Sequence, residues 1–494
     1  MDIKMKRTYR VVLALLALVL ALSLAFAGCS SQNDAAAYVV SIAQTGETES
    51  GESEFTVTYS DGTTSTFTVK NGQNGEDGQD VTAADLYEEY KKQTGDESIT
   101  YAEFLEKYLD ITVPSDNSAA IASILRSAVR VYSEYRTTEY SSSGWGGAGV
   151  RPVDTVSYSM GGGVICEMND TYTYIITNYH VVYSTDANED NGSNIGRSFH
   201  IYPYGSSETP VNTGTQDEDG YDILDYGSSA VECEYIGGSA SLDIAVLRAS
   251  TEELLAVNDS VAEVTYADGY TVGETAIAVG NPEGEGMSVT EGIVSVDSEY
   301  INLSTDGTTR SHRSMRIDAA LYEGNSGGGV FNEDGELIGI ANAGDGTDQN
   351  INYAIPVSVA RGAAENIIAG YEANGEATGV TRPTLGVTVS ISNSKYVYDS
   401  QTSSGKITET VTVSEVTENS IAAGTFALQA GDVLTAFVIN DTEYQIDRSF
   451  EVNDLLLTVR AGDKIAFKYE RDGTDGVQTT AQYTLLASDF SAVA

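Results

Sequence analysis

Short apolar runs separated by glycine and polar turn residues recur through most of the chain and predict a mainly β protein. Between residues 38 and 71, apolar and polar positions alternate on both sides of Asp61-Gly62, which is the pattern of a β-hairpin. The capping signals Thr82-x-x-Asp85 and Thr100-x-x-Glu103 then predict two short helices. We therefore interpret residues 38–112 as a small hairpin and helical spacer module.

The strongest apolar run lies near the N-terminus, from Val11 to Ala27, and follows four basic residues. Basic residues, an apolar stretch and then small residues are typical of a secretory signal, and the run is slightly short for the alternative, a membrane-spanning helix. The following Gly28-Cys29 resembles the cleavage site of bacterial lipoproteins. This resemblance predicts a signal peptide over residues 1–28, lipidation at Cys29, a linker over 29–37, and a lipid-anchored protein on the extracytoplasmic side of the cell membrane.

Charge narrows the choice of partners. The chain has 26 Lys and Arg against 73 Asp and Glu, a formal net charge of −47. Nucleic acid and anionic lipid surfaces should repel such a chain, so we expect no nucleic-acid partner and a membrane contact through lipid alone. Acidic residues are dense in a polar insertion over residues 184–229, where Asp217–Asp222 suggests either calcium or, as we expect, a solvated loop.

A serine among glycines carries the candidate chemistry. Ser326 lies in the run from Leu321 to Phe331, LYEGNSGGGVF, between two apolar strand-like segments. Glycines let a backbone turn sharply and point N–H groups at a developing oxyanion, which a serine nucleophile requires. An ordinary glycine-serine turn is the alternative.

A serine nucleophile needs a base, and the chain has three histidines. His180 ends the apolar run that begins at Thr173 and is the candidate base, although a histidine satisfied in a core remains an alternative. His200 and His312 lie in polar surroundings, and we expect both to be solvated.

The third member of a triad is a carboxylate that orients the histidine. Asp243 interrupts the apolar run Ser241–Leu247, where an unpaired carboxylate would be costly, so it should have a partner. The partner is His180 in the catalytic interpretation and a nearby arginine such as Arg248 in the structural one. The order His180, Asp243, Ser326 is that of the chymotrypsin-type triad, and together the three signals favour a protease.

Several segments now show a family resemblance. The runs GGGVICEMNDTYTYIITNYHVV, SLDIAVLR, VGETAIAVGNPEG, VTEGIVS, DAALYEGNSGGGVFNEDGELIGIAN and QNINYAIP resemble trypsin-like serine proteases of the HtrA (DegP/DegS-like) family. The resemblance implies a chymotrypsin-like double β-barrel of two six-stranded barrels over residues 119–368. It also implies that His180 is the general base, that Asp243 orients it and that Ser326 is the nucleophile.

The same resemblance assigns two further parts of an active site. The N–H groups of Gly324 and Ser326 would form the oxyanion hole, with Asn325 between them. The S1 pocket would be lined by Ala320, Asn352, Tyr353 and Ala354. Ala320 replaces the aspartate of trypsin-like enzymes that cut after lysine or arginine, so we expect a small or apolar P1 residue.

The chain departs from the family pattern in two places. Gly329 stands where the family has proline after the GNSGG motif, and Tyr322-Glu323 stands where the family has asparagine-proline before it. Neither change removes a catalytic group, but both alter the loop that shapes the oxyanion hole and the S1 pocket.

After a linker at residues 369–381, residues 382–490 resemble a PDZ domain, an α+β fold. The segments that carry the resemblance are VTVSEVTENSIAAGTFALQAGDVLTAFVIND and DLLLTVRAGDKIAFKYERDG, with their Gly-Asp pairs at 431–432 and 462–463. The resemblance implies that Leu385, Gly386 and Val387 bind the carboxylate of a peptide C-terminus. The alternative is that these residues are simply a first β-strand.

After removal of the signal peptide and lipidation of Cys29, Cys166 and Cys233 are the remaining cysteines. A disulfide between them and two buried thiols stay open as alternatives, and neither lies in a cluster with metal-ligand spacing, so we expect no metal and no cofactor. HtrA proteins are commonly trimers, which makes a homotrimer an implication of the resemblance alone.

The features together predict a lipid-anchored serine endopeptidase that cleaves unfolded or misfolded exported proteins, with a PDZ domain that binds peptide C-termini. The alternative is a catalytically inactive, protease-like scaffold that binds peptides at the cell surface.

Overall fold

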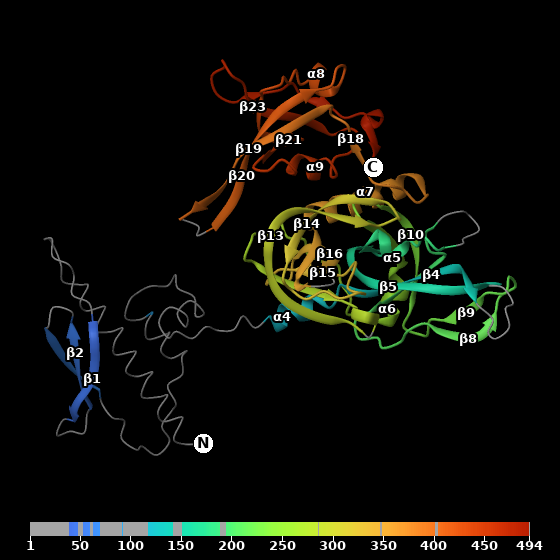
Figure 1. Ribbon diagram of the computed structural model, residues 1–494, viewed down its shortest axis with the longest axis horizontal. Helices are drawn as coiled ribbons and strands as arrows, with labels where there is room; N and C mark the ends of the chain where they lie inside the picture. The colour runs from blue at the N-terminus through green and yellow to red at the C-terminus, as the bar shows by residue number, and fades with distance from the viewer. Residues whose placement is uncertain are drawn as a thin grey trace. The chain divides into compact units, whose positions relative to one another are not determined.

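The structure is a computed structural model that describes residues 39–47, 53–59, 63–69, 91, 117–141, 151–187, 194–284, 286–345, 348–400 and 404–493 (Figure 1). The chain forms two compact units that divide after Asp116. The first unit contains an antiparallel sheet in the order β1-β2-β3, with β1 at Val39–Glu47, β2 at Ser53–Tyr59 and β3 at Thr64–Val69. Strands β2 and β3 form the expected hairpin, and β1 is a third strand that the sequence pattern did not separate.

Other N-terminal expectations lie outside the described residues. These are the signal peptide, Cys29 and, apart from the helical Lys91, the two short helices. Among the residues that the structure describes, no helix is long and apolar enough to cross a membrane.

The second unit begins with α4 (Ser118–Ile124) and the first of two closed six-stranded barrels. The first barrel has the order β10-β11-β6-β5-β4-β7. Its strands are β4 (Ala128–Ser141), β5 (Arg151–Met168), β6 (Tyr172–Thr177), β7 (Ser198–Pro203), β10 (Val231–Ser239) and β11 (Ile244–Ser250). Two short helices accompany it, α5 (Tyr179–Val182) and α6 (Thr251–Val257).

The second barrel has the order β12-β13-β14-β17-β16-β15. Its strands are β12 (Thr275–Gly280), β13 (Ser288–Ser304), β14 (Thr309–Ile317), β15 (Gly329–Phe331), β16 (Leu337–Asp345) and β17 (Asp348–Pro356), with the 3-10 turn η1 (Pro282–Gly284) after β12. The expected pair of six-stranded barrels is therefore present.

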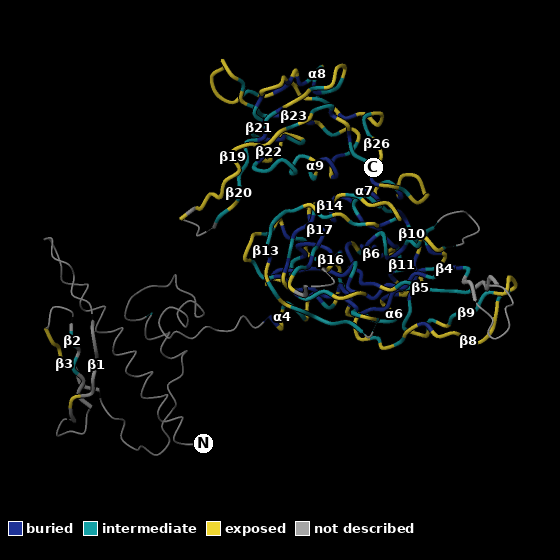
Figure 2. Tube along the Cα trace, viewed as in Figure 1, coloured by how far each residue is buried: buried dark blue, intermediate teal, exposed yellow. Residues whose placement is uncertain are grey.

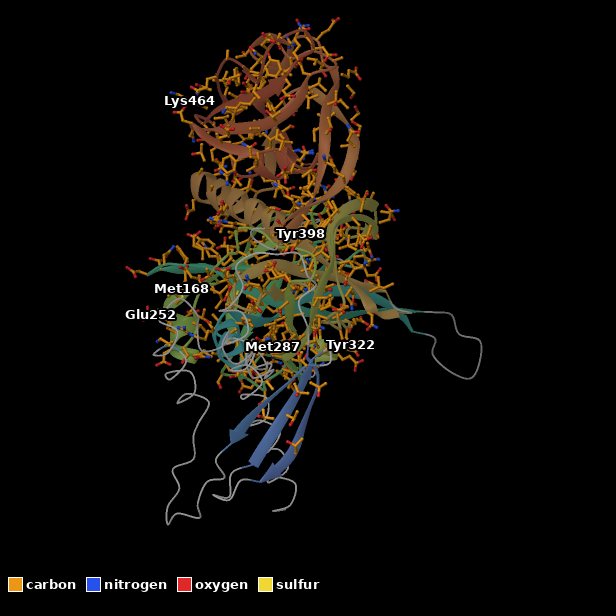
Figure 3. All side chains as sticks on the ribbon, turned by 90° about the vertical axis from the view of Figure 1, so that its left-hand side faces the viewer. Met168, Glu252, Met287, Tyr322, Tyr398 and Lys464 are labelled. Atoms are coloured by element: carbon orange, nitrogen blue, oxygen red, sulfur yellow. The ribbon has the colours of Figure 1, made fainter. Side chains whose placement is uncertain are left out.

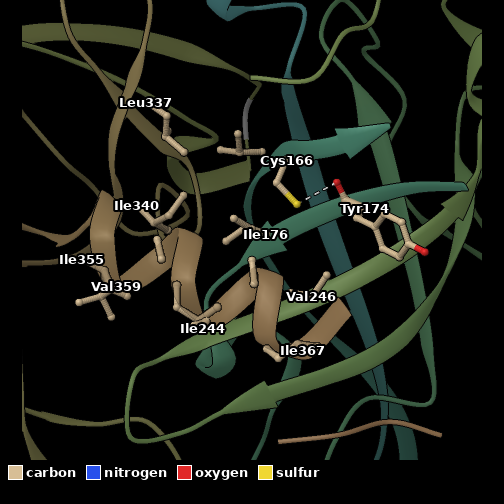
Figure 4. Packing of buried hydrophobic residues seen from close by; sticks show 14 of the residues in the cluster. Cys166, Tyr174, Ile176, Ile244, Val246, Leu337, Ile340, Ile355, Val359 and Ile367 are labelled. Carbon is tan, nitrogen blue, oxygen red and sulfur yellow. Dashed lines mark hydrogen bonds between the residues drawn. The ribbon is translucent and has the colours of Figure 1, made fainter. Parts of the chain in front are cut away.

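The sequences of the central barrel strands are continuous apolar runs because both faces of these strands are buried. Successive side chains of a strand point to opposite sides, so neighbours enter different cores. Ile175 of β6 packs inside the first barrel, whereas Ile176 packs between that barrel, the second barrel and α7 (Val357–Asn374). Figure 4 shows this shared cluster, which includes Ile176 and Val246 of the first barrel, Ile340 of the second barrel and Val359 of α7. Each fully buried aliphatic side chain contributes about 1.5–3 kcal/mol.

A third body of structure follows α7. Its main sheet has the order β19-β20-β21-β23-β24, with β22 paired to β21 and β25 paired to β23, and β18 pairs with β26. The elements are β18 (Thr381–Pro383), β19 (Val387–Asp399), β20 (Ser404–Val416), α8 (Ile421–Gly424), β21 (Val433–Ile439), β22 (Thr442–Gln445), α9 (Glu451–Leu455), β23 (Lys464–Glu470), β24 (Gln478–Thr479), β25 (Tyr483–Thr484), η2 (Ala487–Asp489) and β26 (Phe490–Ala492). A separate hydrophobic cluster that includes Phe426, Phe437 and Phe467 forms its core.

The acidic insertion is shorter than residues 184–229. Ser198–Pro203 within it is strand β7, whose Phe199, Ile201 and Tyr202 are buried in the first barrel. What remains polar is centred on the two-stranded sheet of β8 (Val211–Gln216) and β9 (Asp222–Asp225), where the β8 residues are exposed (Figure 2). The Asp217 carboxylate accepts hydrogen bonds from the N–H groups of Asp219 and Tyr221 and pairs with Arg136 at 2.6 Å.

Candidate active site

His180 and Asp243 come from two separate segments of the first barrel, and their side chains are in contact. His180 lies in α5, immediately after strand β6, and Asp243 lies in the turn before β11, with a positive φ of 52°. Oδ2 of Asp243 lies 2.8 Å from Nδ1 of His180, and Oδ1 accepts the backbone N–H of His180 at 3.0 Å. The Asp243 side chain is fully buried, while the His180 side chain is 33% exposed.

Two opposing effects act on the pKa of His180. Burial on its own would lower the pKa, because it penalises the charged imidazolium. The Asp243 carboxylate, through its charge and its hydrogen bond, outweighs burial and raises the pKa above the ordinary value of 6.5. The structural alternative for Asp243 does not apply, since Arg248 pairs instead with Glu234 at 2.6 Å.

Ser326 lies in a turn between β14 and β15 that packs against the segment leading to His180. The N–H of Gly162 donates to the carbonyl of Ser326 at 2.8 Å, and the Thr177 hydroxyl donates to the carbonyl of Gly162 at 2.8 Å. Gly327 has a φ of +85°, and a side chain there would lie 2.3 Å from the Thr177 hydroxyl oxygen. Only glycine satisfies both the conformation and the close approach.

The Ser326 hydroxyl donates to the carbonyl of Asn342 on β16 at 3.2 Å. The hydrogen bond between a catalytic serine and its histidine base is often long or poorly aligned until a substrate binds. The arrangement therefore keeps the hydroxyl beside the β16 carbonyl.

The backbone N–H groups of Gly324 and Ser326 find no acceptor among the described residues. Gly324 has a φ of +94°, and its carbonyl accepts a hydrogen bond from the N–H of Asn281 at 3.3 Å. Asn325 between them is 4% exposed. Two free N–H groups next to a serine hydroxyl can stabilise an oxyanion.

The four residues assigned to the S1 pocket occupy different environments. Ala320 is partly exposed, and its carbonyl accepts a hydrogen bond from the Thr290 hydroxyl at 2.8 Å. The Asn352 side chain is buried and donates to the carbonyl of Ala319 at 2.9 Å. Tyr353 is partly buried, whereas Ala354 packs in the core of the second barrel.

The expectation that both other histidines are solvated is wrong for His312, and His200 is only partly exposed. His312 lies on β14 and is only 3% exposed, and burial is the main cause that lowers its pKa. His200 lies on β7, where its ring stacks on Tyr226 with centroids 3.5 Å apart, and burial lowers its pKa to about 4. Both histidines sit on barrel strands, which the polar residues around them in sequence concealed.

Comparison with known proteins shows which proteins this chain resembles. Residues 161–340 match the model of the trypsin-like peptidase domain. The Serine protease Do-like HtrA of Lactococcus lactis subsp. lactis is 28% identical over 384 residues, which cover 74% of this chain and 81% of that protein. The chain therefore contains a trypsin-like peptidase domain and is similar to HtrA-type serine proteases. The Bacillus subtilis protein of the same description is 28% identical over 331 residues, covering 65% of this chain and 63% of that protein.

A solved structure described as "HtrA-type protease AlgW with decapeptide" is 22% identical to this chain, covers 75% of it and 98% of its own length, and has a TM-score of 0.43.

The packing around Gly329 explains why a glycine fits at this position. A side chain at Gly329 would lie 2.3 Å from the ring of Phe331, which is fully buried in the core shared by the two barrels. Strand β15 therefore accepts glycine here because Phe331 occupies the space that a larger residue would need.

The two cysteines of the peptidase domain are free and buried in different cores. Cys166 donates to the carbonyl of Tyr174 at 3.3 Å, and Figure 4 shows this contact within the shared core. Cys233 packs inside the first barrel. The alternative of two buried thiols is the one observed.

A cavity of about 560 Å³ lies beside the segments that carry His180 and Asp243. Its walls include Tyr179, Ser241, Arg310 and Thr378, and Ser326 is not among them. The cavity thus lies next to the candidate site without containing the candidate nucleophile.

Leu385 and Gly386 lie in a loop directly before β19, which begins at Val387. Gly386 has a φ of +77°, and its carbonyl accepts the N–H of Thr417 at 2.8 Å. The carbonyl of Leu385 accepts the N–H of Ala422 at 3.0 Å. The N–H groups of Leu385 and Gly386 have no acceptor in the described part of the chain, so this loop presents donors to a ligand.

Three asparagines contribute to the site but were not found in the sequence. Asn178 donates to the carbonyl of Asp243 at 2.9 Å, Asn281 contacts Gly324 as described above, and the carbonyl of Asn342 accepts from Ser326. Each is far in sequence from the residue it contacts. Their only sequence signal is that they lie inside the segments that resemble the family.

Proposed function

We propose that the chain is a lipid-anchored, extracytoplasmic serine endopeptidase in which His180, Asp243 and Ser326 act as a catalytic triad. The observation that carries the proposal is the pair of hydrogen bonds between His180 and the Asp243 carboxylate, together with the close approach of Ser326 and Val181, the residue after His180, around Gly161. Asp243 holds Nδ1 of the imidazole, which leaves Nε2 available to a proton from Ser326.

In this mechanism, the Ser326 hydroxyl rotates from the carbonyl of Asn342 towards His180 and attacks the scissile carbonyl. His180 takes the hydroxyl proton and then gives it to the leaving amine, while the buried Asp243 stabilises the imidazolium. A water molecule then hydrolyses the acyl-enzyme, with His180 again acting as base, and restores the serine.

The oxyanion hole is proposed at the N–H groups of Gly324 and Ser326, on either side of Asn325. Both donors lack acceptors among the described residues, which supports this assignment. Removal of one such donor typically costs about 100- to 1000-fold in turnover.

The proposed S1 pocket lies along Ala320 and Asn352, with Tyr353 and Ala354 continuing strand β17. The pocket residues are uncharged, and the Asn352 amide is held against the carbonyl of Ala319. An uncharged pocket favours a small or apolar P1 side chain, since a buried cation would lack a counter-ion.

The domain that follows α7 is proposed to be a PDZ domain that binds the C-terminus of a peptide. The free N–H groups of Leu385 and Gly386 would hold the carboxylate, and the peptide would add as a strand beside β19, which is an edge strand of its sheet.

The cellular role that fits these parts is the degradation of unfolded or misfolded exported proteins at the outer side of the cell membrane. Curated relatives from Haemophilus influenzae and Rickettsia conorii have "periplasmic" in their names. The lipid on Cys29 would anchor the chain, and a homotrimer remains part of this proposal.

Hydrolysis of unfolded casein tests the proposal, with the chain from Ser30 onward compared with Ser326→Ala. Replacement of a triad serine costs on the order of 10⁵- to 10⁶-fold in turnover. Labelling by a fluorophosphonate provides a second measurement that does not depend on the choice of substrate. If the parent chain neither cleaves nor labels, even with C-terminal peptides added, a peptide-binding scaffold is the better description.

A further inference from the structure

Three segments lie near Ser326 in addition to β16. They are Met160–Gly162 of β5, the η1 turn, and the loop Tyr322–Gly324 before the nucleophile. The N–H of Glu283 in η1 donates to the carbonyl of Glu323 at 2.7 Å, which ties the second segment to the third. A side chain at Gly284 would lie 2.2 Å from the sulfur of Met160, so η1 also contacts β5.

The surface of these three segments is apolar and acidic. Met160 is 36% exposed and Tyr322 is 47% exposed, and Figure 3 shows Tyr322 at the surface of the peptidase domain. Glu283 and Glu323 are also exposed, and within the described residues neither carboxylate has a hydrogen-bond or ion-pair partner. No lysine or arginine occurs in residues 157–163, 279–289 or 319–328.

Glu323 lies next to the proposed oxyanion hole in the chain. Glu323 directly precedes Gly324, whose free N–H is one of the two donors proposed for the oxyanion. Glu283 adopts a left-handed conformation, with a φ of 53°, and its backbone bond to Glu323 keeps the two residues adjacent.

Two strands contact Ser326, and each is expected to carry one half of a substrate. Ser326 contacts Asn342 of β16, the strand that leads to Gly344 beside Asn352 of the proposed S1 pocket. The residues before the scissile bond are expected there. The second strand is β5, whose Gly162 donates its N–H to the carbonyl of Ser326 and whose Met160 precedes Gly162. The residues after the scissile bond are expected along this second strand.

We propose that Glu323 and Glu283, together with Met160, form a subsite that selects cationic residues directly after the scissile bond. The inference rests on the proposed endopeptidase function and adds a substrate class to it: unfolded segments in which lysine or arginine follows the cleaved bond. The aliphatic part of a lysine or arginine side chain packs on Met160 while its charged group reaches the carboxylates.

The test compares two quenched fluorescent peptides of identical sequence up to an alanine at P1. One has lysine and the other glutamate at both of the first two positions after the scissile bond. The parent chain from Ser30 onward should cleave the lysine peptide with a kcat/KM about tenfold higher at low salt, because two rim carboxylates each attract a cation and repel an anion. The preference should shrink at high ionic strength.

Three variants locate the preference. In the double variant Glu323→Gln/Glu283→Gln, the ratio of kcat/KM for the lysine peptide to that for the glutamate peptide should fall to about twofold. In each single variant, this ratio should lie between the values of the parent chain and the double variant. The ratio is taken within one variant, so any general effect on the nearby oxyanion hole cancels. Glu252→Gln is the matched control, because Glu252 is an exposed acid of α6 that lies far from Tyr322 in Figure 3. Its ratio should equal that of the parent chain.

Equal cleavage of both peptides by the parent chain overturns the subsite and leaves the endopeptidase standing. An unchanged ratio in the double variant also overturns it, since the preference would then come from the overall negative charge of the chain. Absence of both cleavage and fluorophosphonate labelling overturns the proposed function and the subsite with it.

Discussion

The Asp243 carboxylate binds His180 through both of its oxygens, one to the imidazole Nδ1 at 2.8 Å and one to the backbone N–H at 3.0 Å. The second bond fixes the position of α5, and the first fixes the orientation of the ring. A fully buried carboxylate with two partners on the same residue holds the imidazole rigidly. Such support is required of a base that must meet a serine hydroxyl.

The raised pKa of His180 predicts the acid side of the pH profile. The base must be neutral to accept a proton, so kcat/KM should fall as the pH drops through the pKa of His180. Because this pKa is raised above 6.5, the midpoint should lie above 6.5. Initial rates of peptide cleavage between pH 5 and 9 measure it, and a midpoint below 6 would contradict the assignment of His180 as the base.

The variant Asp243→Asn separates the charge of the carboxylate from its shape. Loss of the charge removes the effect that raises the pKa of His180 and leaves burial, which lowers it. The midpoint of the pH profile should move down, and turnover should fall by about 10⁴-fold. Retained turnover with an unchanged midpoint would mean that Asp243 serves the structure only.

Specificity at P1 should follow the uncharged pocket. The parent chain should cleave peptides with alanine or valine at P1 and cleave those with arginine poorly. Ala320→Asp should raise kcat/KM for the arginine peptide by about tenfold or more, since a charged hydrogen-bonded pair contributes about 1.5–3 kcal/mol. Efficient cleavage after arginine by the parent chain would refute the pocket assignment.

Packing at Gly329 predicts a measurable loss of stability. The variant Gly329→Ala places a methyl group against the buried ring of Phe331. Overpacking of a well-filled core typically costs about 1–3 kcal/mol in the free energy of unfolding. Urea denaturation followed by circular dichroism measures it. Gly269→Ala is the control, because nothing lies within 4 Å of a side chain at that position.

The ion pair between Asp432 and Arg471 should stabilise the domain after α7. Burial would raise the pKa of Asp432, but the bonds from Arg471 outweigh it and lower the pKa below 3.8. Its contribution is therefore present above pH 3.8 and is lost as the pH falls through the lowered value. Asp432 is 1% exposed, so Arg471→Ala should cost about 3 kcal/mol at pH 7.

A surface pair in the same domain provides the comparison. Lys468 and Glu443 are 33% and 36% exposed, and Lys468→Ala should change the free energy of unfolding by less than about 1 kcal/mol. If Arg471→Ala and Lys468→Ala lowered the free energy of unfolding equally, the burial of Asp432 would not strengthen its ion pair with Arg471.

Much of the architecture could be predicted from local sequence patterns. Continuous apolar runs between glycines and polar turns predict strands, and the resemblance implied two six-stranded barrels, which the structure contains. The sequence predicted the hairpin of β2 and β3 from Asp61-Gly62 but did not separate β1. Polar residues near His200 and His312 misled the prediction, because burial in a barrel depends on strands that are distant in sequence.

The sequence by itself determined which residues are available for chemistry. With three histidines in the chain, one serine in a glycine-lined motif and one acid within an apolar run, few combinations were possible. Only the tertiary structure decided that Asp243 contacts His180 and not Arg248, that Ser326 contacts Asn342, and that both cysteines are free. The contacts of His180 with Asp243 and of Ser326 with Asn342 join residues that are 63 and 16 positions apart, so they depend on the pairing of strands around the barrels, which no local pattern specifies.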